Sequence, residues 1–264
     1  MKRLLCLLLA LCLPLGALAE EAPGYIGDNQ YRDDSLYVWI DRVERDDSVY
    51  YVAHVNILKP EQLATALSAD ANQTLADIAE ASGFVVAING ETYKRVQRGW
   101  IIRGGEVLRK DSQGKHDLLL IDAAGDFHAV RLPNKASIAA ALAANDVREC
   151  FAQGPVLVQD GIRQYVYKSA GGSKVRAART AIGQIGPLYY VLVVVEGKTE
   201  ASKGVTHRQL SKFMLDLQCK TAYALDSGAN SALWFGGRIV NQPSDGALPA
   251  ADDAIGFRTL AGAE

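Results

Sequence analysis

The ten residues Ala222–Ser231 constrain the fold most, because their side chains change abruptly from apolar to small and polar. A short apolar run ends at Asp226, small or polar residues follow, and a second apolar run begins at Ala232. This pattern predicts a buried strand, a tight loop and another strand. The carboxylate of Asp226 then stands at the carboxyl end of a strand, where sheets of the α/β type tend to bind ligands. An ordinary turn has the same composition, so a functional interpretation needs a second stretch at the same place.

A second stretch of this kind lies much earlier in the chain. Phe84–Ile88 is a continuous apolar run, which predicts a strand buried on both faces. Asn89, Gly90 and Glu91 follow it directly, so an amide, a glycine and a carboxylate again come after a buried strand. Asn-Gly after a strand is also a common turn. We expect the two strand ends to converge on one site.

The remaining patterns predict hairpins, helices and one strongly apolar strand. Leu36–Val43 and Val49–Ile57 are rich in β-branched and aromatic residues and have polar residues between them, which predicts a hairpin. Leu188–Val195 is the most apolar run of strand length. Because the chain has no internal repeat and no evident linker, we expect a single α+β domain in which helices pack on a mixed β-sheet. Further hairpins are predicted at 101–107 and 117–130, helices at 74–83, 137–147 and 206–217, and a mobile loop at 169–174.

Residues 1–19 have the pattern of a secretory signal peptide. Lys2 and Arg3 precede an apolar stretch, and Ala17-Leu18-Ala19 supplies an A-x-A cleavage site. The apolar stretch is short for a membrane span. We therefore expect an exported chain, periplasmic or secreted, with no stable membrane insertion after cleavage. Residues 20–48 are then a lead-in with the first strand, and residues 49–264 are the main domain.

Charge and cysteine content narrow the partners. The formal charge of −2 becomes −4 once Lys2 and Arg3 leave with the signal peptide. A mildly acidic chain with scattered basic residues does not suggest nucleic-acid binding. In an exported chain, Cys150 and Cys219 either form one disulfide or stay as two buried thiols. The spacing typical of zinc sites is absent, and His207, in the first turn of a predicted helix, is expected to be solvated.

Five short motifs occur in order along the chain. They are AING at 87–90, GPVLV at 154–158, ARTAIG at 178–183, GVT at 204–206 and LDSG at 225–228. There is neither a G-x-S-x-G nucleophile elbow nor a phosphate-binding P-loop. In the order and spacing of these motifs the chain resembles the phosphodiester glycosidase family. The similarity covers Val49 to Gly256, and the ARTAIG and LDSG motifs carry most of it.

The resemblance implies a hydrolase that cleaves a sugar–phosphate diester between sugar and phosphate. Phosphate is a good leaving group, so neutralising its charge matters more than acid assistance, and the planar guanidinium of Arg179 suits that role. A carboxylate must act on the oxocarbenium-like sugar, and we assign Asp226 first and Glu91 second. No cofactor is required, although Asp226, Glu91 and Asn89 offer oxygen ligands for a divalent cation. The substrate-binding residues that we expect are Asn89, Gly90, Arg179, Thr180, Ser227, Gly228 and Ser231.

Two loops depart from the usual sequence of the family, and they keep other functions open. The family reads Asn-Gly-Gly-Phe-Phe where this chain has NGETY at 89–93, and Asp-Gly-Gly-Gly-Ser where it has DSGAN at 226–230. Side chains in place of glycines restrict the backbone and intrude on a ligand. A surface ion pair is the structural alternative for Arg179. The functional alternative is a non-catalytic protein that binds glycans or exopolysaccharide, and the sequence leaves the oligomeric state open.

Overall fold

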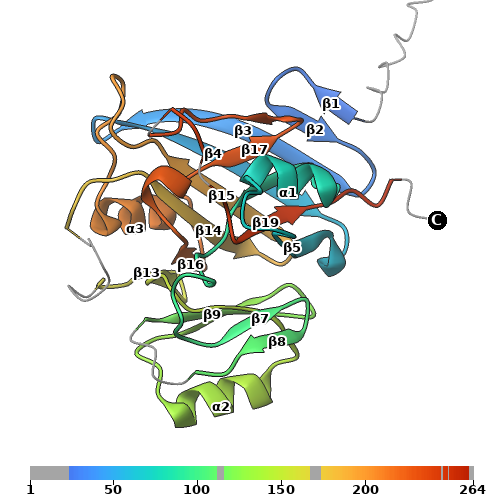
Figure 1. The fold of residues 1–264 in the computed structure, drawn as a ribbon, viewed down its shortest axis with the longest axis vertical. Coiled ribbons are helices and arrows are strands. Elements are labelled where there is room, and N and C mark those ends of the chain that lie inside the picture. Colours follow the sequence, from blue (N-terminus) through green and yellow to red (C-terminus); the bar gives the residue numbers. More distant parts are fainter. Residues whose placement is uncertain (1–23, 112–115, 167–173, 245, 249, 262–264) are drawn as a thin grey trace, which may run out of the picture.

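The computed structural model describes residues 24–111, 116–166, 174–244, 246–248 and 250–261. Within these residues the chain forms three β-sheets and three α-helices (Figure 1). All registers between the strands of these sheets are antiparallel. The signal peptide that we predict at 1–19 lies outside the described residues, as does most of the loop predicted at 169–174.

The largest sheet has the predicted hairpin and the most apolar strand near its centre. Its nine strands run in the order β1-β2-β3-β4-β15-β14-β16-β12-β13. β3 and β4 pair from Leu36 with Ile57 to Arg45 with Ser48, so the boundary that we placed between residues 48 and 49 falls inside one hairpin. The strands are β1 Gly24–Ile26, β2 Gln30–Arg32, β3 Leu36–Arg45, β4 Ser48–Ile57, β12 Val156–Gln159, β13 Ile162–Arg163, β14 Arg179–Gly186, β15 Tyr189–Val195 and β16 Thr221–Ala224.

A five-stranded sheet packs against one face of the largest sheet. Its order is β18-β17-β6-β19-β5. Ile88 and Leu233 from this sheet share one buried hydrophobic cluster with Val55 and Leu192 from the largest sheet, so the main core lies between the two sheets. A short 3₁₀ turn, η1 (Pro60–Gln62), leads into the edge strand. The strands are β5 Leu63–Leu67, β6 Val86–Asn89, β17 Leu233–Phe235, β18 Arg238–Ile239 and β19 Asp253–Phe257.

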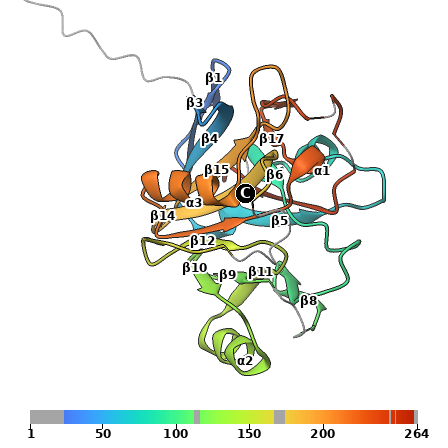
Figure 2. The ribbon, with the colours of Figure 1, turned by 90° about the vertical axis from the view of Figure 1, so that its left-hand side faces the viewer.

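A second five-stranded sheet forms a smaller lobe at one end of the molecule (Figures 1 and 2). Its order is β10-β9-β11-β7-β8. Helix α2 (Lys135–Ala144) covers it, with Ile138 packed among Ile101, Leu120 and Cys150. The strands are β7 Ile101–Arg103, β8 Glu106–Arg109, β9 Leu118–Asp122, β10 Phe127–Val130 and β11 Val147–Phe151.

Helix α3 (His207–Asp216) covers the other face of the largest sheet. Thr206 caps it: its hydroxyl accepts from the Gln209 N–H, and the Gln209 side chain accepts from the Thr206 N–H at 3.0 Å. Leu210 and Met214 bury its apolar side against the sheet. Helix α1 (Leu75–Ala81) has an equivalent cap at Thr74 and Asp77. None of the helices in the described residues is long and apolar enough to cross a membrane.

The chain is richer in β-structure than the α+β arrangement that we expected, and the prediction of a mixed sheet with packed helices is wrong in that respect. Leu188–Val195 is apolar throughout, a pattern that is also typical of parallel strands covered by helices. In the structure one face of β15, with Tyr190 and Leu192, is buried against the sheet that contains β6 and β17. The other face, with Val191 and Val193, is buried against α3. Two covering layers therefore explain the apolar run without any parallel pairing.

Of the two expectations for the cysteines, the disulfide is not formed. Cys150 lies in β11 of the smaller lobe and Cys219 lies just after α3, and both are buried free thiols. They belong to different hydrophobic clusters. Because their clusters are built around different sheets, the other expectation, two buried thiols, is the one that this structure has.

Candidate active site

The two stretches singled out in the sequence do meet in the structure. The N–H of Leu225, which follows β16, donates to the Thr180 carbonyl at 2.9 Å. The N–H of Asp226 donates to the Gly90 carbonyl at 3.1 Å. The end of β16 is therefore held against both β14 and the residue that follows β6, and the chain that leaves it forms a short 3₁₀ turn, η2 (Gly228–Asn230).

The side chain of Asn89 holds this junction together. Its Oδ1 accepts from the Thr180 hydroxyl at 2.7 Å and from the Ala232 N–H at 3.1 Å. Its Nδ2 donates to the Asp226 carbonyl at 3.2 Å. Asn89 is 3% exposed and Thr180 is fully buried. Their polar atoms are engaged within the protein and do not line the cleft described next, so the structure does not support the prediction that these two residues bind substrate.

A cleft of about 210 Å³ opens beside Asp226, and we call it the Asp226 cleft. It is bounded by the loop after β6, the segment before β12, the start of α3 and the end of β16. These segments lie far apart in the sequence, and the fold brings them to one place. The polar side chains along it are Thr92, His116, Gln153, His207, Asp226 and Ser227.

Asp226 supplies the carboxylate of the cleft, and its catalytic role stays a prediction. Burial raises the pKa of this carboxyl above its ordinary value, and the hydrogen bond that the Asn230 side-chain amide donates to Oδ2 opposes this rise. The charge of Asp252 raises the pKa further, whereas that of Arg95 lowers it. Asp226 also lines a narrow recess of about 10 Å³, space for one water molecule, together with Asn89, Gly90, Glu91 and Asp252.

Arg179 lies behind the cleft and reaches it through Ser227. Its Nη1 donates to the Ser227 Oγ at 3.2 Å, its Nε to the Val205 carbonyl at 3.1 Å and its Nη2 to the Val175 carbonyl at 2.8 Å. The residue is 3% exposed, and burial lowers the pKa of the guanidinium to about 10. It therefore carries its charge at neutral pH. A surface ion pair, the structural alternative for this arginine, is not what the structure contains.

His207 is a residue of the cleft that sequence reasoning missed. We expected it to be solvated, but it is 5% exposed and lines the cleft at the first residue of α3. Burial lowers the pKa of its imidazole to about 3, and the charge of Arg179 adds to this effect. The capping box at Thr206 predicts where the helix begins, but it does not predict which way the first turn faces.

Gln153 forms part of the opposite wall. Its Oε1 accepts from the Thr92 hydroxyl at 3.2 Å, whereas its Nε2 is buried and has no hydrogen-bond partner among the described residues. The Nδ1 atom of His207 is likewise buried and has no hydrogen-bond partner among the described residues. Buried polar atoms in native proteins are nearly always paired, so two unpaired ones along the same cleft indicate a place where a ligand or water completes the bonding.

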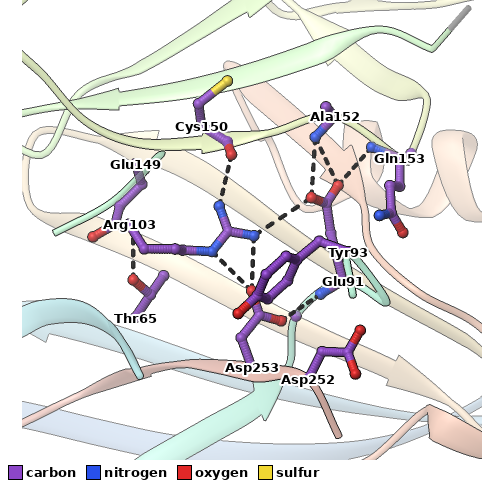
Figure 3. Close-up of polar contacts among 12 residues, drawn as sticks. Thr65, Glu91, Tyr93, Arg103, Glu149, Cys150, Ala152, Gln153, Asp252 and Asp253 are labelled. Atoms are coloured by element: carbon purple, nitrogen blue, oxygen red, sulfur yellow. Dashed lines mark hydrogen bonds and ion pairs between the residues drawn. The ribbon is translucent and has the colours of Figure 1, made fainter. Parts of the chain in front are cut away.

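Glu91, our second catalytic candidate, does not face the cleft. Its side chain is 0% exposed. Its Oε1 accepts from the backbone N–H groups of Ala152 at 2.8 Å and Gln153 at 2.6 Å, and its Oε2 lies 3.4 Å from Nη2 of Arg103 (Figure 3). The geometry of the Asp226 cleft therefore does not support a catalytic role for Glu91, which stays a prediction. In this structure Glu91 fixes the backbone of Gln153, a cleft residue.

Arg103 and Asp253 complete this buried cluster. Arg103 Nε and Nη2 donate to the Asp253 Oδ2 at 2.8 and 2.7 Å, and the Asp253 Oδ1 accepts from the Glu91 N–H at 2.7 Å (Figure 3). A Cβ atom on Gly90 would lie 2.2 Å from that Oδ1. Gly90 is thus required for the close approach of Asp253, which is a structural reason for a glycine that we had assigned to substrate binding.

The remaining predicted site residues differ in their surroundings. Gly228 has a φ of +79° with open space around it, and its N–H donates to the Ala178 carbonyl at 3.1 Å. Ser231 is 2% exposed, and its Oγ has no partner among the described residues. Neither lines the Asp226 cleft. In the described part of the chain no three His, Cys, Asp or Glu side chains are grouped so as to hold a metal ion.

Known structures share this architecture. The chain is similar to the catalytic domain of zebrafish N-acetylglucosamine-1-phosphodiester alpha-N-acetylglucosaminidase, auto-inhibited by its pro-peptide, with a TM-score of 0.69 and 17% identity over 90% of this chain and 87% of that one. It is also similar to a hypothetical protein from Synechocystis, with a TM-score of 0.55 and 14% identity over 84% and 62% of the two chains. At these identities the likeness shows a common fold.

Sequence comparison identifies the family. A model described as phosphodiester glycosidase matches residues 82–258, more than half of the 264 residues. The chain therefore belongs to the phosphodiester glycosidase family. It is also 30% identical over 115 residues to the SPbeta prophage-derived uncharacterized protein YomE of Bacillus subtilis (strain 168), which is 43% of this chain and 18% of that protein. The chain thus spans less than a fifth of the length of this curated relative.

Proposed function

We propose that the protein is a hydrolase that cleaves the glycosidic bond of a sugar–phosphate diester in the Asp226 cleft. One observation carries the proposal: a carboxylate and a hydroxyl bound to a buried guanidinium stand on consecutive residues, Asp226 and Ser227, at the edge of one cleft. Membership of the family supports the reaction class. A zebrafish protein of the same fold is named as a glycosidase of N-acetylglucosamine 1-phosphodiesters.

The phosphate side of the reaction rests on Arg179 and Ser227. As the glycosidic bond breaks, negative charge grows on the departing phosphate oxygen, and a cation held near it stabilises that charge. Arg179 is buried and held by two backbone carbonyls, so it does not have to reorganise during the reaction. Its hydrogen bond to the Ser227 Oγ leaves the hydroxyl proton of Ser227 free to point toward a phosphate oxygen.

The sugar side of the reaction rests on Asp226. Its carboxylate, when ionised, stabilises the positive charge that develops on the sugar ring, either through space or by forming a covalent glycosyl intermediate. Glycosidases commonly use two carboxyl groups, but a phosphate leaves without strong protonation, so one carboxylate in the cleft suffices for this substrate class. The Asn230 side-chain amide donates to Oδ2 of Asp226, and this bond together with one from the Ser227 backbone orients the carboxylate.

A second candidate function has its own supporting observation. With Glu91 withdrawn into the buried cluster, the cleft has fewer acidic groups than a two-carboxylate glycosidase needs. A non-catalytic protein that binds glycans or exopolysaccharide would tolerate this loss. Binding without turnover across a panel of sugar–phosphate diesters would favour that function over hydrolysis.

The decisive experiment measures release of sugar from the methyl diester of N-acetylglucosamine 1-phosphate. We expect wild-type turnover, and we expect Asp226→Asn and Arg179→Ala each to lower kcat/KM by at least about 10²-fold, as losses of charge stabilisation do. Arg42→Ala, at an exposed ion pair with Glu44, is the control and should keep wild-type activity. Full activity in either site variant would overturn the proposal. Retained activity after exhaustive chelation would exclude an essential exchangeable cation.

We further propose that the chain is exported and acts on envelope or extracellular polymers. The composition of residues 1–19 supports this, because it has the charge, apolar stretch and cleavage site of a signal peptide. A Burkholderia pseudomallei K96243 protein of similar fold, with a TM-score of 0.53 and 14% identity over 80% and 74% of the two chains, is described as exported. Sequencing the amino terminus of the protein from its native host tests cleavage after Ala19.

A further inference from the structure

His207 lines the Asp226 cleft and carries a buried polar atom without a partner among the described residues. The residue is 95% buried, since only 5% of its surface is exposed, and its Nδ1 has no hydrogen-bond partner among the described residues. Folding does not leave a buried polar atom unpaired without a loss of stability. The imidazole therefore has hydrogen-bonding capacity that the described residues leave unused, beside a cleft that a ligand can enter.

The imidazole offers hydrogen bonds without charge. Burial and the neighbouring charge of Arg179 lower the pKa of His207 to about 3, so the ring is neutral wherever the protein works near neutral pH. A neutral imidazole has one nitrogen that donates and one that accepts. Either nitrogen can therefore complement a hydroxyl or an amide, whereas the ring adds no positive charge for a phosphate.

Gln153 provides a second neutral group in the same cleft. Its Oε1 is engaged by the Thr92 hydroxyl, and its Nε2 is buried without a partner. The backbone N–H of Gln153 donates to the Glu91 carboxylate at 2.6 Å, which fixes the position of this residue in the wall. A free amide donor and a neutral imidazole together match a polar, uncharged group such as the hydroxyl-bearing ring of a sugar.

The position of Arg179 indicates which part of the sugar meets His207. Arg179 holds Ser227 at the place proposed for the phosphate, and its Nε donates at 3.1 Å to the carbonyl of Val205, two residues before His207. In a sugar 1-phosphate the phosphate is attached to the anomeric carbon. We propose that His207 hydrogen-bonds the substituent on the sugar carbon next to the anomeric carbon and thereby selects the sugar. This rests on the proposed function, because it takes a sugar phosphate as the ligand.

Calorimetric titration of the whole protein tests the proposal with three probes: glucose 1-phosphate, N-acetylglucosamine 1-phosphate and 2-deoxyglucose 1-phosphate. The third lacks the substituent in question. We expect wild type to bind the better of the first two about ten-fold more tightly than the third, the effect of one hydrogen bond. His207→Leu should bind all three within about two-fold of one another, and His207→Gln, which restores a neutral hydrogen-bonding group, should recover part of the discrimination.

Controls separate this role from a structural one. His128→Leu, the same change at a histidine that pairs with Asp122 in the smaller lobe, should keep the discrimination. The Tm of His207→Leu should be no lower than that of wild type, because the change removes an unpaired polar atom. A lower Tm together with loss of inorganic phosphate binding would overturn the proposal in favour of a structural role.

The remaining outcomes are also decisive. Wild type that does not discriminate among the probes, or that binds none of them, overturns the proposal, as does His207→Leu that discriminates as well as wild type. Diester hydrolysis is measured separately. Discrimination that depends on His207 without any hydrolysis would end the proposed hydrolase and leave the role of His207 standing.

Discussion

Arg103 and Asp253 join the smaller lobe to the main core, because β7 carries the guanidinium and β19 carries the carboxylate. Nε and Nη2 of Arg103 lie 2.8 and 2.7 Å from the same Oδ2 atom of Asp253, and both side chains are almost entirely buried. The guanidinium also lies over the Phe151 ring at 4.0 Å and donates to the Cys150 carbonyl at 2.6 Å. The wall of the cleft at Gln153 therefore depends on an ion pair that is buried in the protein.

Loss of Arg103 should be severe. Arg103→Met would leave two carboxylates, Glu91 and Asp253, buried without their cation, and breaking a buried pair in this way costs about 3–5 kcal/mol. Urea unfolding measures the free energy of unfolding. The control is Arg42→Met, which breaks an exposed pair worth less than about 1 kcal/mol. A cost for Arg103→Met as small as that of the control would contradict the role assigned to the cluster.

Gly90→Ala should destabilise the protein although it adds a single methyl group. The new Cβ would lie 2.2 Å from the Asp253 Oδ1, so the strands at the junction must move apart. Overpacking of this kind costs about 1–3 kcal/mol. Gly186→Ala is the matched control, because nothing lies within 4 Å of its Cβ position and its φ is not in the left-handed region. Equal midpoints of urea unfolding for the two variants would show that the residues around Gly90 accommodate the new methyl group without loss of stability.

Thr180 provides a test of positioning against binding. Thr180→Val removes the hydroxyl that donates to Asn89 Oδ1 at 2.7 Å and keeps the shape of the side chain. We expect a loss of about 1 kcal/mol in the free energy of unfolding, whereas Thr180→Ser should retain the bond. If Thr180 bound substrate directly, Thr180→Val would instead raise KM at unchanged stability. Measuring both thermal unfolding and diester kinetics for this variant distinguishes the positioning role from the binding role.

Sequence patterns predict the meeting of the strand ends but not which side chains face the cleft. Asp226 and Asn89 are predictable because apolar runs of strand length end at each of them, and buried strands of one core tend to end near one another. Glu91 has the same local pattern, yet its partners Arg103 and Asp253 lie elsewhere in the chain. Nothing next to Glu91 in the sequence indicates that its side chain will be buried beside the Arg103 guanidinium.

The same reasoning explains the errors in fold class. An apolar run such as Leu188–Val195 indicates that both faces of the strand are buried. It does not indicate whether a helix or another sheet packs on each face. Antiparallel pairing was predictable only for sequential hairpins such as β3 with β4. The pairing of β4 with β15 joins strands far apart in the chain, which local patterns do not encode.

Glu91 should make stability depend on pH. Burial raises the pKa of Glu91 to about 7 from an ordinary 4.5; the charge of Arg103 opposes this rise, and the charge of Asp253 adds to it. Between these two values the folded protein keeps a proton that the unfolded chain has lost, so stability falls as pH rises through this window, by up to about 3 kcal/mol. Glu91→Gln cannot ionise and should lack this part of the dependence.

Urea unfolding of wild type and Glu91→Gln at pH 5 and pH 8 measures the effect. The stability of wild type relative to Glu91→Gln should be greater at pH 5 than at pH 8, because only wild type must ionise a buried carboxyl between them. Asp253 is present in both proteins, so its own raised pKa affects both and largely cancels in the difference. A difference that is constant with pH, or that grows toward pH 8, would mean that the N–H groups of Ala152 and Gln153 outweigh the cost of burying the charge.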